Sequence, residues 1–427
     1  MLRRRRGGVE GGVVGRPVTR QGRGVGLVLL PVLLLSTAGA PGAVAADADD
    51  SLPAVSAAVP RGGGCVTPAR RSLAGAPWAQ AYLGYTRAWE RSRGEGVTIA
   101  VLDTGVDSDA PALKGRVVVG PDLAGGAGRE SGADCAGRGT FVAGLAGAAP
   151  LKGTGFAGVA PGARILSVRV TGDDGTASAD RVAAGVRAAL ARKARVIAVP
   201  LALPRGSRAL TAAVRAAVDQ GSVVVAPAYA PAAAGDPETA APAAYPAALP
   251  EVVAVAALAP GGVPDRTLPP LTAPDVAAPG TALVGVGPGR GQLTGSGADL
   301  ATGFVAGAAA LVVTARPQVT GPELADRLTA TAYRMPAAGP GLVGAGSVDP
   351  VAAVTAPWPA RAAAPHGRAV SVTAPAAHTA RGTALALTVA VAGAAGALLL
   401  GVFTVSRGRR RGWRAGTGAA DAGPDAW

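Results

Sequence analysis

Short apolar runs alternate with amphipathic segments through the middle of the chain. Each run is short enough for a buried strand, and the stretches between them place apolar residues at helical spacing. Because strands that alternate with helices build a parallel sheet covered on both faces, we predict an α/β domain. The predicted strands are 97–102, 165–170, 195–199, 222–226 and 252–257, and the predicted helices are 179–193 and 208–219.

Segments rich in proline, alanine and glycine separate and precede these elements. Residues 227–250 and 259–281 are predicted to be surface loops. Residues 46–75 form an extension with little periodicity, whereas residues 76–357 are long enough for one large core. No internal repeat is visible, so we predict a single globular domain behind an N-terminal extension.

The first 45 residues have the three regions of a secretory signal peptide. Arg3 to Arg6 and Arg23 precede an apolar stretch from Val25 to Leu35, and a small-x-small site ends at Ala45. A retained membrane anchor is the alternative, but the apolar run is short for a membrane span. We therefore predict a signal peptide over 1–45, cleaved after Ala45.

The other end of the chain resembles a membrane anchor. No charged residue lies between Arg381 and Arg407, and the sequence RGRRRGWR follows directly. We predict a stalk over 358–382, a transmembrane helix over 383–406 and a basic tail over 407–427. A buried globular helix could be equally apolar but would rarely end in such a basic cluster. By the positive-inside rule the C-terminus is cytoplasmic and the globular domain lies outside the cell membrane.

The formal net charge of +14 raises the possibility of a nucleic-acid partner. Residues 1–45 contribute +6 and residues 384–427 contribute +3, so the globular part retains only about +5. The basic ends serve export and membrane topology. Because no interleaving of aromatic and basic residues and no zinc-ligand spacing is present, nucleic acid is not predicted as a partner.

Three motifs resemble those that carry the catalytic triad of subtilisin-type serine proteases. VTIAVLDTGVD ends a predicted strand at Asp103, GRGTFVAGLAGA contains Arg138, and GSGADLATGFVAGAAAL contains Asp299. The order of Asp103, Arg138 and Asp299 matches the subtilisin order of Asp, His and Ser. The resemblance implies a subtilisin-like parallel sheet with helices on both faces, and a site in which the histidine and the serine are both replaced.

Further segments are similar to mycosins, membrane-anchored subtilisin relatives associated with type VII secretion. They are PWAQAYLGYTRAWERSRGEGVTIAVLDTGVD before the first motif, GVAPGARILSVRV at 158–170 and GAGSVDPVAAVTAP at 344–357. The resemblance covers roughly residues 62–405. It implies that the partners are type VII secretion membrane components.

The replaced residues cannot perform serine-protease chemistry. Asp103 can still orient a base, but the guanidinium of Arg138 stays protonated and cannot accept a proton. A carboxylate at Asp299 is a poor nucleophile toward amides. At the position of the oxyanion-hole asparagine the resemblance places Tyr229, within VVVAPAYAP. We expect Arg138 instead to donate charge-assisted hydrogen bonds to both Asp103 and Asp299.

Other residues offer no evident replacement for the missing groups. Both histidines of the chain, His366 and His378, lie in the predicted stalk, and Ser296 lies in a GSG turn. Asp103-Thr104-Gly105 matches the aspartic-protease motif, but a second copy would be required. The segment VIAVPLALP carries Pro200 and Pro204 where subtilisins bind a peptide strand, and proline offers no N–H there.

The resemblance also implies a disulfide between Cys65 and Cys135, which would tie the extension to the loop before Arg138. An exported protein permits such a bond, and two free thiols are the alternative. With both histidines distant from the cysteines, no metal site and no cofactor are predicted.

The sequence therefore predicts a mycosin-like pseudoprotease with a structural or binding role. The alternative is an active serine endopeptidase that uses other residues, which a histidine inside the domain would have favoured. A decaying gene copy is a third possibility, but the intact signal, core pattern and anchor argue against it.

Overall fold

The computed structural model describes residues 52–56, 58–59, 64–68, 72–125, 131–151, 153–229, 243–266, 270–358 and 380–412. The predicted signal peptide, most of the predicted stalk with His366 and His378, and the end of the basic tail lie outside the described residues. Residues 52–358 include the sheet and its covering helices, and the C-terminal helix is described separately.

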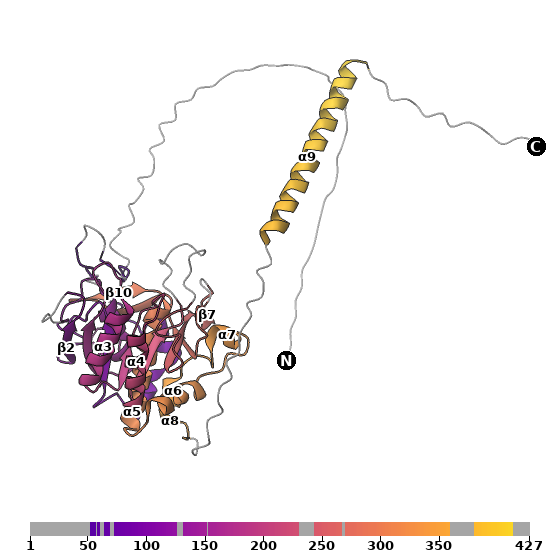
Figure 1. Cartoon of the computed structure of the whole chain (residues 1–427). Helices are drawn as coiled ribbons and strands as arrows, with labels where there is room; N and C mark the ends of the chain where they lie inside the picture. Colours follow the sequence, from indigo (N-terminus) through magenta and orange to yellow (C-terminus); the bar gives the residue numbers. More distant parts are fainter. Residues whose placement is uncertain are drawn as a thin grey trace, which may run out of the picture. The chain divides into compact units, whose positions relative to one another are not determined.

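A largely parallel sheet forms the centre of the domain (Figure 1). Within the described residues it has eight strands in the order β2-β3-β1-β4-β5-β6-β7, with β8 also paired to β6, and only β7 runs antiparallel. The strands are β1 Thr98–Asp103, β2 Val117–Asp122, β3 Arg164–Arg169, β4 Val196–Ala198, β5 Val223–Pro227, β6 Val252–Ala259, β7 Val263–Pro264 and β8 Val276–Pro279.

The five predicted strands and both predicted helices are present, with ends shifted by at most two residues. The prediction of surface loops was wrong in two places. Residues 259–281 contain β8, whose four residues are all buried, and 227–250 include the buried Ala228 and Tyr229. A four-residue strand of Val, Ala and Pro is too short to show a period, so only its pairing with β6 identifies it.

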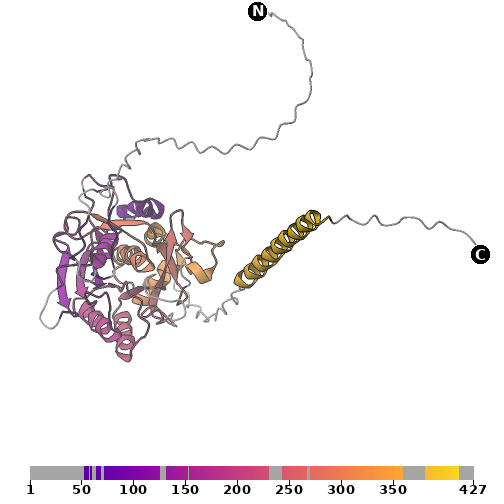
Figure 2. The ribbon, with the colours of Figure 1, turned by 90° about the horizontal axis from the view of Figure 1, so that it is seen from above.

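Side chains from alternate strand positions enter two separate cores, one on each face of the sheet. Ile99 and Val101 of β1 pack with helices α2 and α5, whereas Ala100 and Leu102 pack with α3 and α4. Figure 2 shows these helices on the two sides of the sheet. Their bounds are α2 Arg138–Gly147, α3 Ala179–Ala191, α4 Arg208–Asp219 and α5 Ala298–Ala315.

Shorter elements complete the domain. A two-stranded hairpin of β9 and β10 lies ahead of α5, and α6 begins with a capping box formed by Thr320 and Glu323. The bounds are α1 Trp78–Leu83, the 3₁₀ helix η1 Tyr85–Glu90, β9 Leu283–Val286, β10 Gln292–Gly295, α6 Gly321–Ala330, α7 Pro340–Val343 and α8 Pro350–Thr355.

The disulfide between Cys65 and Cys135 is confirmed. It joins the extension to the loop directly before α2, across 70 residues of sequence. In the chain-entropy model a cross-link of this length contributes about 4 kcal/mol to the free energy of unfolding. The extension is thus covalently attached beside the predicted site.

Two helices in the described part of the chain are long and apolar enough to cross a membrane. The first, α5, is largely buried and is the central helix of the domain. The second lies within α9, Ala380–Arg410, and its window Ala390–Arg410 is exposed along its length. An exposed apolar helix that ends in arginines fits a single-pass membrane anchor.

Candidate functional site

Asp103 is held at the carboxyl end of β1, in the middle of the sheet. Parallel pairing with β3 and β4 fixes the strand on both sides, and Val170 donates its N–H to the Asp103 carbonyl oxygen at 2.8 Å. The side chain has no solvent-accessible surface. A carboxylate at this depth requires a hydrogen-bonding partner, because an unpaired buried charge is strongly destabilising.

Arg138 is the first residue of α2, directly after a tight turn. Gly137 has a φ of +87°, in the left-handed region that favours glycine. A Cβ on Gly139 would lie 1.9 Å from the carbonyl oxygen of Gly105, so only glycine lets α2 approach the end of β1. This close approach places the Arg138 side chain against Asp103.

The guanidinium of Arg138 binds Asp103 through two nitrogen atoms. Its Nε lies 3.0 Å from both carboxylate oxygens of Asp103, and its Nη2 lies 2.5 Å from Oδ1. Arg138 is 3% exposed and Asp103 is 0% exposed. Such a bidentate, charge-assisted pair is strong, and it occupies the carboxylate at the predicted position of the triad aspartate.

Asp299 lies in the first turn of α5 and approaches the same guanidinium from another side. Its Oδ2 is 4.0 Å from Arg138 Nη1, which is an ion pair but beyond hydrogen-bond length. The expectation that Arg138 hydrogen-bonds both carboxylates was therefore wrong for Asp299. The Asp299 carboxylate lies in the first turn of α5, where the helix dipole favours a negative charge and the backbone of Leu300 acts to lower its pKa.

A third carboxylate, that of Asp134, organises the site and was not identified from the sequence. It accepts hydrogen bonds from Thr104 Oγ1 at 2.8 Å, from the N–H of Gly137 at 2.8 Å and from Thr140 N–H and Oγ1 at 2.8 and 2.7 Å. Asp134 thus binds the start of α2 to the residue after Asp103. An aspartate shortly before the apolar run FVAGLAGA, where the motif resembles the start of a helix, is a signal that could have indicated it.

Burial and mutual charge set the protonation of this cluster. Burial raises the pKa of Asp103, of Asp134 and of Asp299, while the positive charge of Arg138 acts in the opposite direction on Asp103 and Asp299. Burial acts to lower the pKa of Arg138, but Asp103 and Asp299 outweigh it and hold that pKa above its usual value. Arg138 is therefore a permanent cation that cannot act as a base.

The remaining predicted residues form their hydrogen bonds outside this ion cluster. Tyr229 follows β5 and donates its hydroxyl to the carbonyl oxygen of Leu342 at 3.3 Å. Burial raises the pKa of Tyr229 to about 12. Among the described residues we find no hydrogen bond or ion pair between Tyr229 and Arg138 or Asp299. Ser296 accepts the N–H of Ala282 at 3.0 Å, as expected of a turn serine.

The stretch that carries Pro200 and Pro204 has a backbone partner within the domain. Leu203 and Tyr245 exchange two backbone hydrogen bonds of 2.7 and 2.9 Å. Pro200 itself is buried, and Pro204 is exposed next to this bridge. The segment after β4 is therefore already paired at Leu203.

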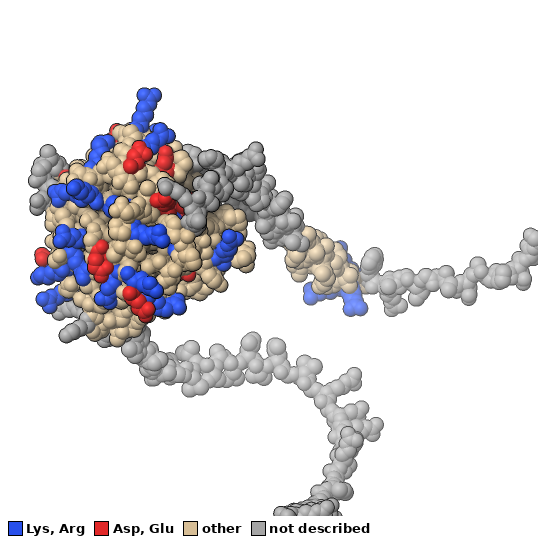
Figure 3. All heavy atoms as spheres, turned by 90° about the horizontal axis from the view of Figure 1, so that it is seen from below, with Lys and Arg blue, Asp and Glu red and all other residues tan. Residues whose placement is uncertain are grey.

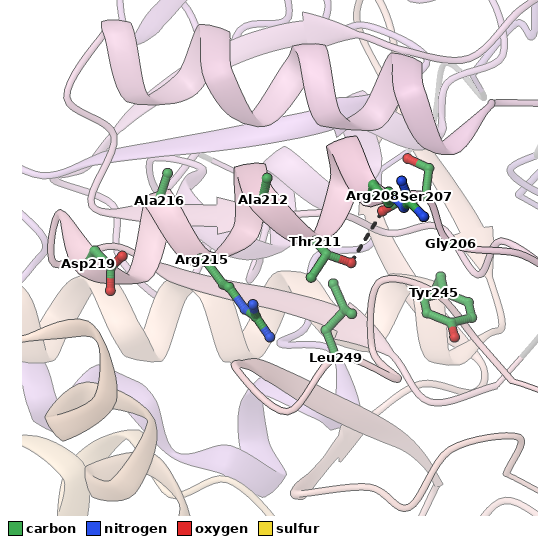
Figure 4. A pocket seen from close by; sticks show the side chains of 10 residues that line it. All are labelled: Gly206, Ser207, Arg208, Thr211, Ala212, Arg215, Ala216, Asp219, Tyr245 and Leu249. Carbon is green, nitrogen blue, oxygen red and sulfur yellow. Dashed lines mark hydrogen bonds between the residues drawn. The ribbon is translucent and has the colours of Figure 1, made fainter.

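A hollow of about 780 Å³ lies beside α4 (Figure 4). Its lining includes Arg208, Thr211, Arg215 and Tyr245, but none of the predicted site residues. Arg215 pairs there with Glu251 at 3.0 Å. Within the described residues no three His, Cys, Asp or Glu side chains come together in a way that could hold a metal ion.

Comparison with known proteins places the whole domain in one family. A sequence model of the Subtilase family matches residues 94–358. Mycosin-3 of Mycobacterium tuberculosis is 32% identical over 338 residues, which cover 66% of this chain and 72% of that protein.

Two solved structures give the same result. The structure of MycP1 from Mycobacterium smegmatis is 27% identical, with a TM-score of 0.60, and the match covers 75% of this chain and 93% of that one. The structure of the MycP3 protease from the type VII (ESX-3) secretion system is 30% identical, with a TM-score of 0.55, and covers 72% and 93%. The subtilisin-like fold predicted from the three motifs is thus confirmed.

The geometry predicts unequal coupling of Arg138 to its two carboxylates. Arg138→Ala should lower the free energy of unfolding by about 3–5 kcal/mol, because it leaves the buried Asp103 without its partner. A double-mutant cycle should give a coupling above about 2 kcal/mol with Asp103→Ala but only about 0–1 kcal/mol with Asp299→Ala. Chemical denaturation measures the free energy of unfolding of each variant. The control is Arg215→Ala, which removes an arginine from the exposed pair with Glu251 and should change stability little. Equal coupling of Arg138 to Asp103 and to Asp299 would contradict the geometry.

The raised pKa of Asp299 predicts a pH-dependent stability. Because the folded protein binds this proton more tightly than the unfolded chain, the carboxyl group contributes stability at low pH that is lost as the pH rises through its folded pKa. Asp299→Asn should therefore gain stability relative to the parent as the pH rises from the acid end of the range to neutral, and the two proteins should be alike at the acid end. Thermal unfolding between pH 3 and pH 8 tests this, with the exposed Asp109→Asn as control; a gain that grows on acidification would contradict it.

Proposed function

Because this chain belongs to the subtilase family but carries Arg138 and Asp299 at the predicted histidine and serine positions, we propose that it is a membrane-anchored, mycosin-like pseudoprotease. Its role is that of a structural or binding component of a type VII secretion system. The observation that carries this proposal is the bidentate pair between Arg138 and Asp103.

The pair supports inactivity for two chemical reasons. A guanidinium that stays protonated cannot remove the proton of a nucleophile, and the orienting carboxylate of Asp103 is already occupied by Arg138. The carboxylate of Asp299 would have to attack an amide without activation by a base. Neither general-base catalysis nor nucleophilic attack is therefore available at these positions.

The alternative is an active serine endopeptidase that uses other residues. Its weakness is the supply of a base, since the chain has two histidines and both, His366 and His378, follow the residues matched by the family model. Tyr229 is directed to Leu342, and Ser296 is engaged in its own turn. These contacts favour the pseudoprotease.

The similarity to mycosins and the exposed apolar helix α9 are the two reasons for proposing an association with a type VII secretion system at the membrane. MycP3 is described as a protease from the type VII (ESX-3) secretion system, and Mycosin-3 is a curated relative. The exposed apolar stretch of α9 supports a single-pass anchor, and the arginines at its end support a cytoplasmic C-terminus. The proposed orientation places the subtilase domain outside the cell membrane.

The charge on the face shown in Figure 3 gives no support for a nucleic-acid partner. Figure 3 shows one face of the molecule on which Lys and Arg side chains are interspersed with Asp and Glu. A nucleic-acid site would require a continuous basic stripe, usually with aromatic side chains for stacking. We therefore retain the proposal that the chain does not bind nucleic acid.

Inactivity is tested with the purified full chain in detergent. Peptide hydrolysis should equal that of buffer, and a fluorophosphonate probe should not label the protein, because neither Arg138 nor Asp299 can activate a serine as a histidine base would. The matched control is Asp299→Ser, which restores the hydroxyl but not the base and should also stay unlabelled, while an active subtilisin is labelled in parallel. Labelling that disappears when one serine is replaced would refute the proposal.

The proposed partnership is tested from native membranes. Tagged full-length chain, cross-linked and purified from its own host, should enrich type VII membrane components above a tagged, unrelated single-pass protein. Enrichment should persist in Arg138→Ala if that variant folds, since binding does not require catalysis. Recovery equal to the unrelated control would contradict the proposed role.

A further inference from the structure

The hollow beside α4 (the α4 hollow) follows the outward face of that helix (Figure 4). Four apolar residues of α4 are buried in the core, so the residues between them point outward. Four polar residues recur on this outward face at spacings of three and four, namely Arg208, Thr211, Arg215 and Asp219. The α4 hollow thus extends along the helix for about 16 Å, at a rise of about 1.5 Å per residue.

Small side chains lie at the centre of this helix face. Ala212 and Ala216 are one turn apart on α4, and Tyr245 and Leu249 line the opposite side of the hollow. Because the distance between two packed helix axes, about 8–10 Å, depends on the side chains at the contact, alanine lets another helix come close. The volume of about 780 Å³ is therefore open to an elongated occupant that lies along α4.

Two arginines on this face have donors that no described residue uses. Arg215 donates from Nε to Glu251 at 3.0 Å and is 64% exposed, and within the described residues its two Nη groups form no hydrogen bond. Arg208 is exposed and has no hydrogen bond or ion pair with any residue that the structure describes. The two arginines are seven residues apart, which is about 10 Å along the helix axis. They can therefore bind two separate acceptors of one ligand.

Carboxylates at the edge of the hollow narrow the class of ligand. Asp219 lies in the last turn of the same face, and Glu251 is paired with Arg215. Both would repel a polyanion such as nucleic acid or an anionic membrane surface. A ligand with separate carboxylates opposite Arg208 and Arg215, and none opposite Asp219, fits the charges of the hollow.

The spacing of the arginines favours a helix over an extended strand as the occupant. Residues seven positions apart lie on one face of a helix, about 10 Å from each other, which matches the separation of Arg208 and Arg215. Residues on one face of a strand recur at about 6.6 or 13 Å, so neither spacing matches. The backbone of α4 is also bonded within the helix and offers no edge with which a strand could pair.

We propose that the α4 hollow is a docking site for an α-helix of a partner protein. The docked helix lies along α4 and presents two acidic residues, seven positions apart, to Arg208 and Arg215. A small or apolar residue between these acids packs against Ala212 and Leu249. The site rests on the proposed binding role and adds to it the kind of segment that is bound, and it requires no chemistry at the ion cluster.

A photo-cross-linker at position 212 identifies the occupant. Full-length chain with p-benzoylphenylalanine in place of the exposed Ala212 is expressed in its own host and irradiated. Mass spectrometry should place the adduct in a partner segment that has two acidic residues seven positions apart. The matched control carries the same group in place of Ala191, an exposed residue at the end of the neighbouring helix α3, and should give little adduct.

Charge reversal tests the two arginines. A fluorescent synthetic peptide of the recovered segment should bind the purified full chain in detergent. Arg208→Glu combined with Arg215→Glu should raise its Kd by about tenfold or more, which corresponds to about 1.4 kcal/mol. Replacing both acids of the peptide by lysine should abolish binding to the parent chain and restore binding to the reversed chain. Arg187→Glu combined with Arg192→Glu, at exposed positions in and directly after α3, is the matched control and should leave the Kd unchanged.

Three outcomes would overturn the site. They are little adduct at position 212, an adduct with a second copy of this chain, and peptide binding that survives the charge reversal. The lysine peptide keeps the test valid if the reversed chain does not fold, because the loss of its binding is measured on the parent chain.

The site and the proposed type VII role fail in different ways. An adduct between position 212 and an acidic helix of an unrelated membrane protein supports the site and contradicts the type VII role. Co-purification of type VII components without an adduct at position 212 supports the role and overturns the site.

Discussion

The ion pair between Arg138 and Asp103 is the interaction on which the centre of this domain depends. Both side chains are buried, and an unpaired charge at either position would strongly destabilise the fold. Their contact requires the start of α2 to lie against the end of β1, which glycine at 139 permits and Asp134 holds through its bonds to Thr104 and Thr140. Arg138, which the motifs place at the predicted histidine position, is thus part of the buried core.

Charge around Arg138 is not distributed symmetrically. Asp103 takes the guanidinium in a bidentate contact, and Asp134 is satisfied by hydroxyl and backbone donors. Asp299, in the first turn of α5, forms only an ion pair with Arg138, at 4.0 Å. Its replacement should therefore alter stability without disrupting the main pair between Arg138 and Asp103.

The N-terminal extension is joined to the domain next to the ion cluster. Ser56 forms a parallel bridge with Gly137, the residue before Arg138, and Cys65 is bonded to Cys135. The bridge of Ala54 with Thr294 lies on β10, shortly before α5 begins. The binding role proposed above requires neither a base nor a nucleophile at these positions.

Sequence alone determined the strands and helices of the sheet, the position of Asp103 at a strand end and, through the resemblance, the family and the Cys65–Cys135 bond. These features are encoded locally, because burial imposes a period on apolar residues and motifs fix the order of the elements. The tertiary structure alone decided that Arg138 hydrogen-bonds Asp103 but reaches Asp299 only as an ion pair at 4.0 Å, and that Asp134 holds the site together. It also decided that 276–279 is a strand and that the extension pairs with β10. Those features depend on which groups approach within hydrogen-bond distance, and residues far apart in the chain carry no periodic signal of such approach.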